Sequence, residues 1–257
     1  ICEMIAAGLK ADLHAGKPKI GAFVKLANPT VIEALGMAGL DFAVIDTEHA
    51  PCDQMLLLDL IRAADSVSLP AIVRVPDGSE SQILKALDIG ASGVQIPGLS
   101  TVDAVKEAVS YTKYAPQGRR GLSFAQRSAS YGNCDKKGYM EASNAGLINV
   151  VHIENKEMAA QVESLCELDG VDVLFIGPMD ISQSLGHPGE PAHPEVAKVV
   201  DEVIRVCLAK GTPYGIFVGT PAAAQTYIDK GAAYIALASD IAFLTSGYKN
   251  SAAQIRL

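Results

Sequence analysis

The sequence predicts an α/β protein in which residues 1–257 form a single (β/α)8 barrel, a TIM barrel. Three observations predict this fold. Eight short apolar segments are spaced along the chain, helical segments separate them, and a glycine stands at several of the joints that lead from a helix into a strand. Eight such alternations match the usual length of this barrel, about 250 residues. A doubly wound open sheet is the alternative, because it is built from the same alternation.

The eight expected strands are short and almost continuously apolar, which is typical of parallel strands buried on both faces. They cover residues 20–24, 42–46, 71–74, 93–96, 147–153, 171–176, 214–218 and 233–237. Helix signals fill the segments between them: residues 196–207, for example, repeat valine, isoleucine and cysteine at the spacing of one helix face.

Five glycines mark the joints where a helix is expected to end and a strand to follow. They are Gly39, Gly90, Gly170, Gly211 and Gly231. The residue after the last helical turn often adopts a left-handed conformation, which glycine tolerates best. The longest connection, residues 97–146, is expected to contain helices at residues 101–112 and near Tyr139. It serves either as a lid or as an interface or insertion.

Composition restricts the class of protein. Hydrophobic residues make up 49% of the chain and charged residues 19%, which supports a large core and a soluble surface. No apolar run approaches the roughly 20 residues of a membrane span, and the first residues lack the pattern of a secretory signal. The five cysteines show no CxxC spacing, so reduced thiols and a cytoplasmic location are expected. A net charge of -8 argues against nucleic-acid binding and favours small-molecule partners.

Charged and polar residues follow several expected strands at their C-terminal ends, where active sites lie in this fold. They are Asp46, Glu48, His49, Arg74, His152, Glu154 and Asp180. Placing such groups beside a core is costly unless they have a function or a partner.

Glu154 and Asp180 follow neighbouring strands and would repel each other unless a cation lay between them. Oxygen ligands favour Mg²⁺ or Mn²⁺ with positions left for water or substrate. Alternatively, Glu154 starts the next helix as a surface carboxylate, and Asp180 caps a helix over residues 181–185. The two together favour a metal site.

Arg74 and His49 are the expected catalytic side chains. The guanidinium of Arg74 suits a carboxylate or a developing oxyanion; the alternative is a structural ion pair with Asp46 or Glu48. His49 lies close in sequence to two carboxylates that could orient its ring for acid/base work.

Six segments resemble the class II pyruvate aldolases, the HpcH/HpaI aldolase family. They are residues 46–51 (DTEHAP), 73–74 (VR), 87–90 (LDIG), 114–121 (YAPQGRRG), 152–154 (HIE) and 175–182 (FIGPMDIS). The resemblance runs from about residue 21 to residue 240 and is nearest to 4-hydroxy-2-oxoheptanedioate and 2-dehydro-3-deoxygalactarate aldolases.

The resemblance implies a role for each matched residue. Glu154 and Asp180 match the ligands of a divalent metal, here Mg²⁺, Mn²⁺ or Co²⁺. Arg74 matches the arginine that contacts the pyruvate oxygen, and Asp46 with His49 matches an acid/base dyad.

The resemblance also implies contacts around the substrate. Gly177 and Pro178 match the turn that lines the pyruvate pocket. Asp88 matches an aspartate that reaches a neighbouring subunit's site, so a homo-oligomer, and in this family a hexamer, is expected. Two departures affect substrate binding: His152 replaces a common glutamine and could contact the metal or its water, and Phe23 replaces a common tryptophan.

The expected reaction is reversible cleavage of a 4-hydroxy-2-oxo acid to pyruvate, or a close 2-oxo acid, and an aldehyde. The metal and Arg74 stabilise the enolate, and His49 moves the hydroxyl proton. Three rivals are a Schiff-base aldolase using Lys25, a CoA-thioester lyase of the citrate lyase β-subunit type, and a non-catalytic ligand-binding barrel. For the CoA-thioester hypothesis, the only basic residues that could bind the phosphates of CoA are Arg119, Arg120 and Arg127.

Overall fold

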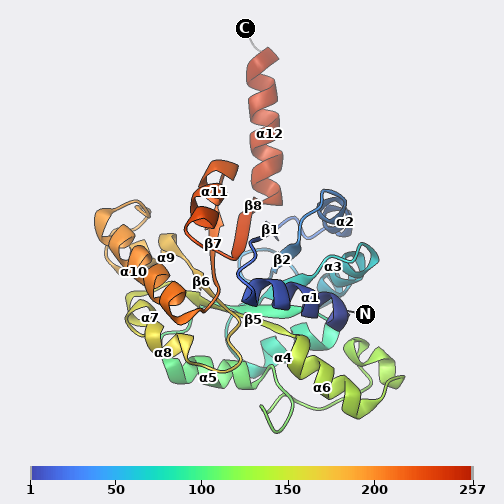
Figure 1. Ribbon diagram of the computed structural model, residues 1–257. Coiled ribbons are helices and arrows are strands. Elements are labelled where there is room, and N and C mark those ends of the chain that lie inside the picture. Colours follow the sequence, from blue (N-terminus) through green and yellow to red (C-terminus); the bar gives the residue numbers. More distant parts are fainter. Residues whose placement is uncertain (1, 256–257) are drawn as a thin grey trace.

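The computed structural model describes residues 2–255, with side chains from residue 6 onward, and contains a closed barrel of eight parallel strands (Figure 1). The strands pair in sequence order, so the predicted barrel is confirmed and the open-sheet alternative is wrong. Each predicted strand agrees with the observed one to within two residues at either end. The strands are β1 (Lys19–Val24), β2 (Phe42–Asp46), β3 (Ala71–Arg74), β4 (Gly93–Ile96), β5 (Ile148–Ile153), β6 (Val173–Ile176), β7 (Tyr214–Val218) and β8 (Tyr234–Ser239).

Helices lie between successive strands, before the first strand and after the last (Figure 1). They are α1 (Cys2–His14), α2 (Pro29–Met37), α3 (Gln54–Ser66), α4 (Glu80–Ile89), α5 (Val102–Ser110), the 3₁₀ helix η1 (Arg127–Gly132), α6 (Lys136–Gly146), α7 (Lys156–Ala160), α8 (Val162–Cys166), α9 (Pro178–Ser184), α10 (Pro194–Lys210), α11 (Pro221–Asp229) and α12 (Asp240–Ile255). All five glycines predicted at helix-to-strand joints have positive φ, and Gly90 and Gly211 are the left-handed caps of α4 and α10.

Alternation along each strand decides which side chains enter the barrel. On β2, Phe42 and Val44 join the inner cluster, whereas Ala43 and Ile45 join an outer one. The next residue in the inner set is Asp46, at the end of the strand. On the other strands the same two-residue period decides which of the last side chains face the barrel mouth.

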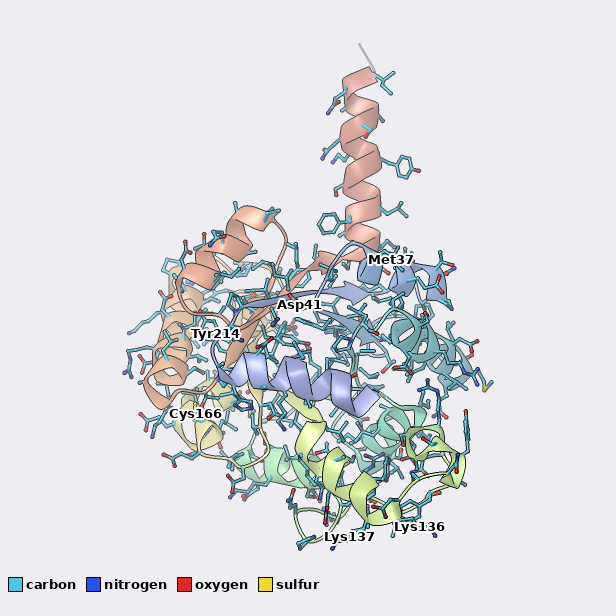
Figure 2. The ribbon with its side chains drawn as sticks, turned by 45° about the vertical axis from the view of Figure 1, so that its right-hand side comes forward. Met37, Asp41, Lys136, Lys137, Cys166 and Tyr214 are labelled. Carbon is cyan, nitrogen blue, oxygen red and sulfur yellow. The ribbon has the colours of Figure 1, made fainter. Side chains whose placement is uncertain are left out.

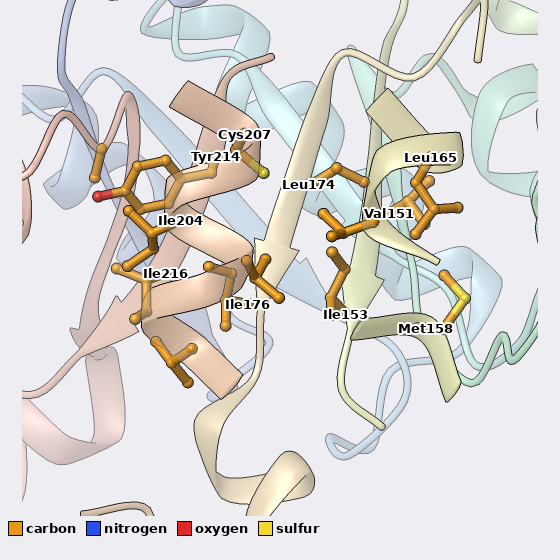
Figure 3. Close-up of a cluster of buried hydrophobic side chains, with 14 of the residues drawn as sticks. Val151, Ile153, Met158, Leu165, Leu174, Ile176, Ile204, Cys207, Tyr214 and Ile216 are labelled. Carbon is orange, nitrogen blue, oxygen red and sulfur yellow. The ribbon is translucent and has the colours of Figure 1, made fainter. Parts of the chain in front are cut away.

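Two outer clusters attach the helices to the barrel. One packs β5, β6 and β7 against α7, α8 and α10, and Figure 3 shows Val151, Ile176 and Ile216 of the strands facing Leu165 and Ile204 of the helices. The other packs β2, β3 and β4 against α3 and α4. At the opposite end from the mouth, α1 places Leu9 and Leu13 against the inner cluster.

The long connection between β4 and β5 folds on itself around Tyr114, Ala129 and Tyr139. It contributes no residue to the mouth cavity described below, which favours an interface or insertion over a lid on this chain's own site. Among the described helices, none is long and apolar enough to cross a membrane.

The helix α12 leaves the barrel instead of packing on it (Figure 1). Side chains along it stand clear of the rest of the described chain (Figure 2). Ile241, Phe243, Leu244, Tyr248 and Ile255 are all large, apolar and exposed. An amount of exposed apolar surface like this marks a site of protein contact.

Candidate active site at the barrel mouth

A cavity of about 790 Å³ opens at the C-terminal end of the strands. Most of the predicted site residues line it: Phe23, His49, Arg74, His152, Gly177, Pro178 and Asp180. Two more predicted residues contact the lining: Asp46 is hydrogen-bonded to Arg74, and Glu154 is hydrogen-bonded to His152. The predicted set therefore converges on one place, except for Asp88.

Asp46 is fully buried and is held by a network of donors. Nε and Nη2 of Arg74 donate to its two carboxylate oxygens at 3.0 and 2.6 Å, and Nζ of Lys25 lies 3.0 Å away. Burial alone would raise the pKa of Asp46, but the hydrogen bonds and charge of Arg74, with help from Lys25 and a backbone N–H, lower it to about 2. Asp46 is thus a permanent anion that fixes Arg74.

The predicted side-chain pairing of Asp46 with His49 is wrong in this structure. Asp46 Oδ1 accepts the backbone N–H of His49 at 3.1 Å, not the imidazole. The ring is 63% exposed and its Nε2 lies 3.7 Å from Oε2 of Glu48. The carboxylate beside the imidazole is therefore Glu48. The role of His49 itself stays a prediction.

Arg74 combines the two interpretations that the sequence left open, because it is ion-paired and also lines the cavity. Besides Asp46, it contacts Oε2 of Glu48 through Nη1 at 3.2 Å and lies over the ring of Phe23. Two of the five N–H groups of this guanidinium donate to Asp46, and the contact with Glu48 is ionic without a hydrogen bond, so the remaining N–H groups are available to a ligand. A fixed, partly free guanidinium is an oxyanion donor.

Two other carboxylates at the mouth, Asp180 and Glu48, lie in surroundings that disfavour their charged forms. Burial, and then the charge of Glu154, raises the pKa of Asp180. Burial also raises the pKa of Glu48, whose buried Oε2 makes no hydrogen bond although it has ionic contacts to Arg74 and His49. A Cβ placed on Gly177 would meet Oδ2 of Asp180 and Cβ of Glu154, each at 3.3 Å, so the side chains of both residues lie beside this turn.

This donor set fits a hard divalent cation, because a cation would relieve the repulsion and oxygen ligands are those that Mg²⁺ and Mn²⁺ prefer. Two protein carboxylates, Glu154 and Asp180, would hold it and leave the other positions to water and substrate. Among the described residues, three or more metal-binding donors lie within 4.8 Å of one another only at His187, His193 and Glu195, outside this pair.

A hydrogen-bonded relay runs from the barrel interior to Glu154. The hydroxyl of Tyr234 donates to Oε1 of Gln95 at 3.0 Å, so the amide NH₂ of Gln95 faces Nε2 of His152 at 2.7 Å. That ring nitrogen then accepts, and Nδ1 donates to Oε2 of Glu154 at 2.8 Å. The predicted contact of His152 with a metal or its water stays a prediction; in this structure its Nδ1 contacts the carboxylate of Glu154, the predicted metal ligand.

The relay and the loop after β4 together orient Glu154. The backbone N–H of Gly98 donates to its Oε1 at 2.5 Å. Burial opposes ionisation of Glu154, but the hydrogen bonds from His152 and Gly98 outweigh it and keep its pKa below the usual value. Phe175 stacks on His152, with ring centroids 5.0 Å apart, and restricts the ring from the other side.

The Schiff-base hypothesis depends on Lys25, and the CoA-thioester hypothesis depends on three arginines. All four side chains form ion pairs with carboxylates of this chain. Lys25 lines the cavity as an ammonium paired with Asp46, and the ammonium is not the nucleophilic form of lysine. Arg119 pairs with Glu107, Arg120 with Asp88 and Arg127 with Asp65. None of these arginines lines the mouth cavity.

Asp88 lies outside the cavity, at the end of α4, where its Oδ1 accepts from Nη2 of Arg120 at 2.9 Å. Its predicted contact with a neighbouring subunit's site stays a prediction.

The turn between α9 and α10 forms one rim of the cavity and is fixed by its own side chains. The rings of His187 and His193 stack with centroids 3.5 Å apart, and Nε2 of His187 lies 2.9 Å from Oε2 of Glu195. Backbone hydrogen bonds from Glu190 to His187 and from His193 to Glu190 close the turn. Pro191 and Ala192 are thereby held in the cavity wall.

The site's residues fall within a span that also matches a known family. The family model described as HpcH/HpaI aldolase/citrate lyase matches residues 19–246. The chain belongs to this family. The resemblance inferred from the sequence is confirmed, and the match covers all eight strands.

Relatives in this family match over most of their length. A 2-dehydro-3,6-dideoxy-6-sulfogluconate aldolase from Pseudomonas putida is 35% identical over 227 residues, 88% of each chain. A 5-keto-4-deoxy-D-glucarate aldolase from Klebsiella pneumoniae is 35% identical over 237 residues, 92% of each chain. Among solved structures, an HpcH/HpaI aldolase/citrate lyase family protein from Burkholderia cenocepacia has a TM-score of 0.93 at 32% identity, covering 98% of this chain and all of the other.

A more distant structure shares the fold alone. The citrate lyase β subunit of M. tuberculosis, complexed with oxaloacetate and magnesium, has a TM-score of 0.56 at 14% identity, covering 89% of this chain and 93% of that one.

Sequence patterns for this HpcH/HpaI family member missed Gln95 and Tyr234. A signal for the first was present, because Gln95 is the one amide in the apolar strand β4. A buried amide inside a parallel strand needs a partner. Nothing in the sequence showed that the partners are Tyr234 and His152.

Proposed function

We propose that the protein is a divalent-metal-dependent aldolase, which cleaves 4-hydroxy-2-oxo acids reversibly to pyruvate, or a close 2-oxo acid, and an aldehyde. One observation carries the proposal: Arg74 and Asp180 line the same cavity. Asp46 holds the guanidinium of Arg74, and Glu154 is hydrogen-bonded to His152, which also lines the cavity. A 2-oxo acid presents a carboxylate and a carbonyl oxygen side by side, which suits a cation on one side and an arginine on the other. The aldolases named among the relatives support the same class of reaction.

Arg74 acts on the pyruvate half of the substrate. When the bond between C3 and C4 breaks, its electron pair passes into the pyruvate unit, and negative charge develops on the C2 oxygen. The N–H groups of Arg74 that do not donate to Asp46 stabilise that charge, and Asp46 prevents the guanidinium from turning away. When bound, the metal supplies Lewis-acid polarisation of the same oxygen.

His49 acts on the aldehyde half. Cleavage requires that the C4 hydroxyl lose its proton as it becomes a carbonyl, and His49 lies at the cavity wall with an exposed ring that can accept it. Glu48, 3.7 Å away, stabilises the imidazolium that results. In the direction of synthesis the same proton returns to the new alkoxide.

Chelation tests the metal dependence. Treatment with EDTA should abolish cleavage, and Mg²⁺, Mn²⁺ or Co²⁺ should restore it. Full activity in EDTA, with borohydride trapping pyruvate on Lys25, would establish the Schiff-base mechanism instead.

We also propose that the chain works as a homo-oligomer, and as a hexamer in particular. The exposed apolar side chains of α12 support this, because a second copy of the chain could cover them. Light scattering at assay concentrations tests the assembly, and a fully active monomer would contradict it.

A further inference from the structure

The cavity is larger than an oxo acid and a cation require. Its volume, about 790 Å³, is near the upper end of the range for small-molecule sites, roughly 300–1,000 Å³. The space beyond Arg74 and Asp180 is bounded by an apolar wall that comes from α9, the following turn, α10, β7 and α11. We define this apolar wall as Met179, Pro191, Ala192, Val200, Phe217 and Tyr227.

Aromatic rings connect this wall directly to the catalytic groups. The guanidinium of Arg74 lies 4.8 Å from the centre of the Phe23 ring, and that ring lies 5.9 Å from the ring of Phe217. A substrate held by Arg74 would therefore extend its far end over Phe217. Phe217 and Met179 remain 45% and 54% exposed, which leaves large apolar surfaces facing the cavity without a partner.

The cavity has no free cation at this end in the part of the chain that the structure describes. Lys25 is paired with Asp46, and Lys230 is paired with Asp201 at 3.3 Å. A second carboxylate on the substrate would lose water here without gaining an ion-pair partner.

We infer that the aldehyde partner of this enzyme is uncharged and apolar, an aliphatic or aromatic aldehyde and not an acidic one. This inference rests on the proposed aldolase function and names the class of its second substrate. The acidic substrates in the names of the relatives are those of the relatives, whereas the apolar wall belongs to this chain.

Two aldehydes of equal length provide the direct test, with pyruvate as the common nucleophile and Mn²⁺ present. Butanal ends in a methyl group, and succinic semialdehyde ends in a carboxylate. We expect kcat/KM for butanal to exceed that for succinic semialdehyde by at least about tenfold. From acetaldehyde to pentanal, kcat/KM should rise about fourfold for each methylene that leaves water.

Variants of the wall test where the selectivity arises. Phe217→Ala should flatten the rise with chain length while leaving the KM for pyruvate unchanged. Phe217→Arg should supply the missing cation and move the preference toward succinic semialdehyde. Leu208→Ala is the matched control, because Leu208 is an exposed apolar residue of α10 that does not line the cavity.

Exchange of the pyruvate methyl protons with deuterated water, followed by NMR, separates this inference from the proposed function. If exchange occurs and succinic semialdehyde is preferred, the inference is overturned and the aldolase function stands. Loss of that preference in Lys230→Gln would then identify Lys230 as the carboxylate's partner, which also contradicts the inference. If neither exchange nor bond formation with any aldehyde is seen, both the proposed function and the inference fail.

Discussion

The relay from Tyr234 to Glu154 leads to a prediction about the effect on metal affinity of Tyr234, a residue that does not line the cavity. Tyr234 is fully buried, and its hydroxyl is the donor that fixes Oε1 of Gln95. In Tyr234→Phe this oxygen has no donor, so the amide is free to flip. A flipped amide would require the proton on Nε2 of His152, and a neutral ring would then turn a lone pair toward Glu154.

The magnitude follows from these contacts. Leaving a buried acceptor without its donor costs about 1–3 kcal/mol. Loss of a partner that orients a metal ligand typically weakens metal binding by about 10- to 100-fold. At about 1.4 kcal/mol for each factor of ten, the two figures agree. We therefore expect Tyr234→Phe to bind Mn²⁺ about 10- to 100-fold more weakly.

Titration calorimetry with Mn²⁺ alone measures this without any substrate. Tyr214→Phe is the control, because Tyr214 is also a fully buried tyrosine but its hydroxyl bonds to the carbonyls of Tyr227 and Lys230 on the outside of the barrel. Both variants should lower the free energy of unfolding. If both also bind Mn²⁺ with wild-type affinity, the relay stabilises the barrel but does not orient Glu154.

Three further outcomes are expected. Arg74→Ala should slow both cleavage and pyruvate methyl exchange about a hundredfold, whereas His49→Ala should slow cleavage by about 10²- to 10⁴-fold and retain more of the exchange; equal loss of exchange would contradict this division. Asp46 has a folded-state pKa below its unfolded value, so its stabilisation, about 2 kcal/mol, is complete above about pH 4 and is lost as the pH falls to about 2. Thermal unfolding of Asp46→Asn should therefore differ from wild type at pH 7 and converge with it near pH 2, and a constant difference would refute the assignment. Phe243→Asp with Leu244→Asp on α12 should dissociate the oligomer in light scattering, and an unchanged mass would show that this face is not the interface.

The strands and their order could be predicted because the information is local. A parallel strand buried on both faces is a short apolar run, and a glycine with positive φ ends the helix before it, as at Gly90 and Gly211. The two-residue period then places the last residue of each strand inside or outside the barrel. Asp46 and Arg74 both follow an inner residue by two positions, so their presence at the mouth was predictable.

The relay could not be predicted, because its members are far apart in the sequence. Gln95 and Tyr234 are separated by 139 residues and meet across the interior of the barrel. Which inner side chains meet there depends on the stagger of the strands and on side-chain rotamers. Neither can be deduced from hydrophobic periodicity.

The error at Asp46 has a physical reason that applies to other barrels. The family resemblance and the short sequence distance both indicate His49 as its partner, but proximity in a parallel sheet is decided by register. Asp46 and Arg74 are paired Cα positions of β2 and β3, so their side chains leave neighbouring strands at the same level. The chain turns after Asp46 so that its carboxylate accepts backbone N–H groups of Glu48 and His49, which directs the imidazole away from it. The arginine is both nearer and permanently charged, and it therefore takes the carboxylate, while the histidine remains exposed to the cavity and available to a substrate.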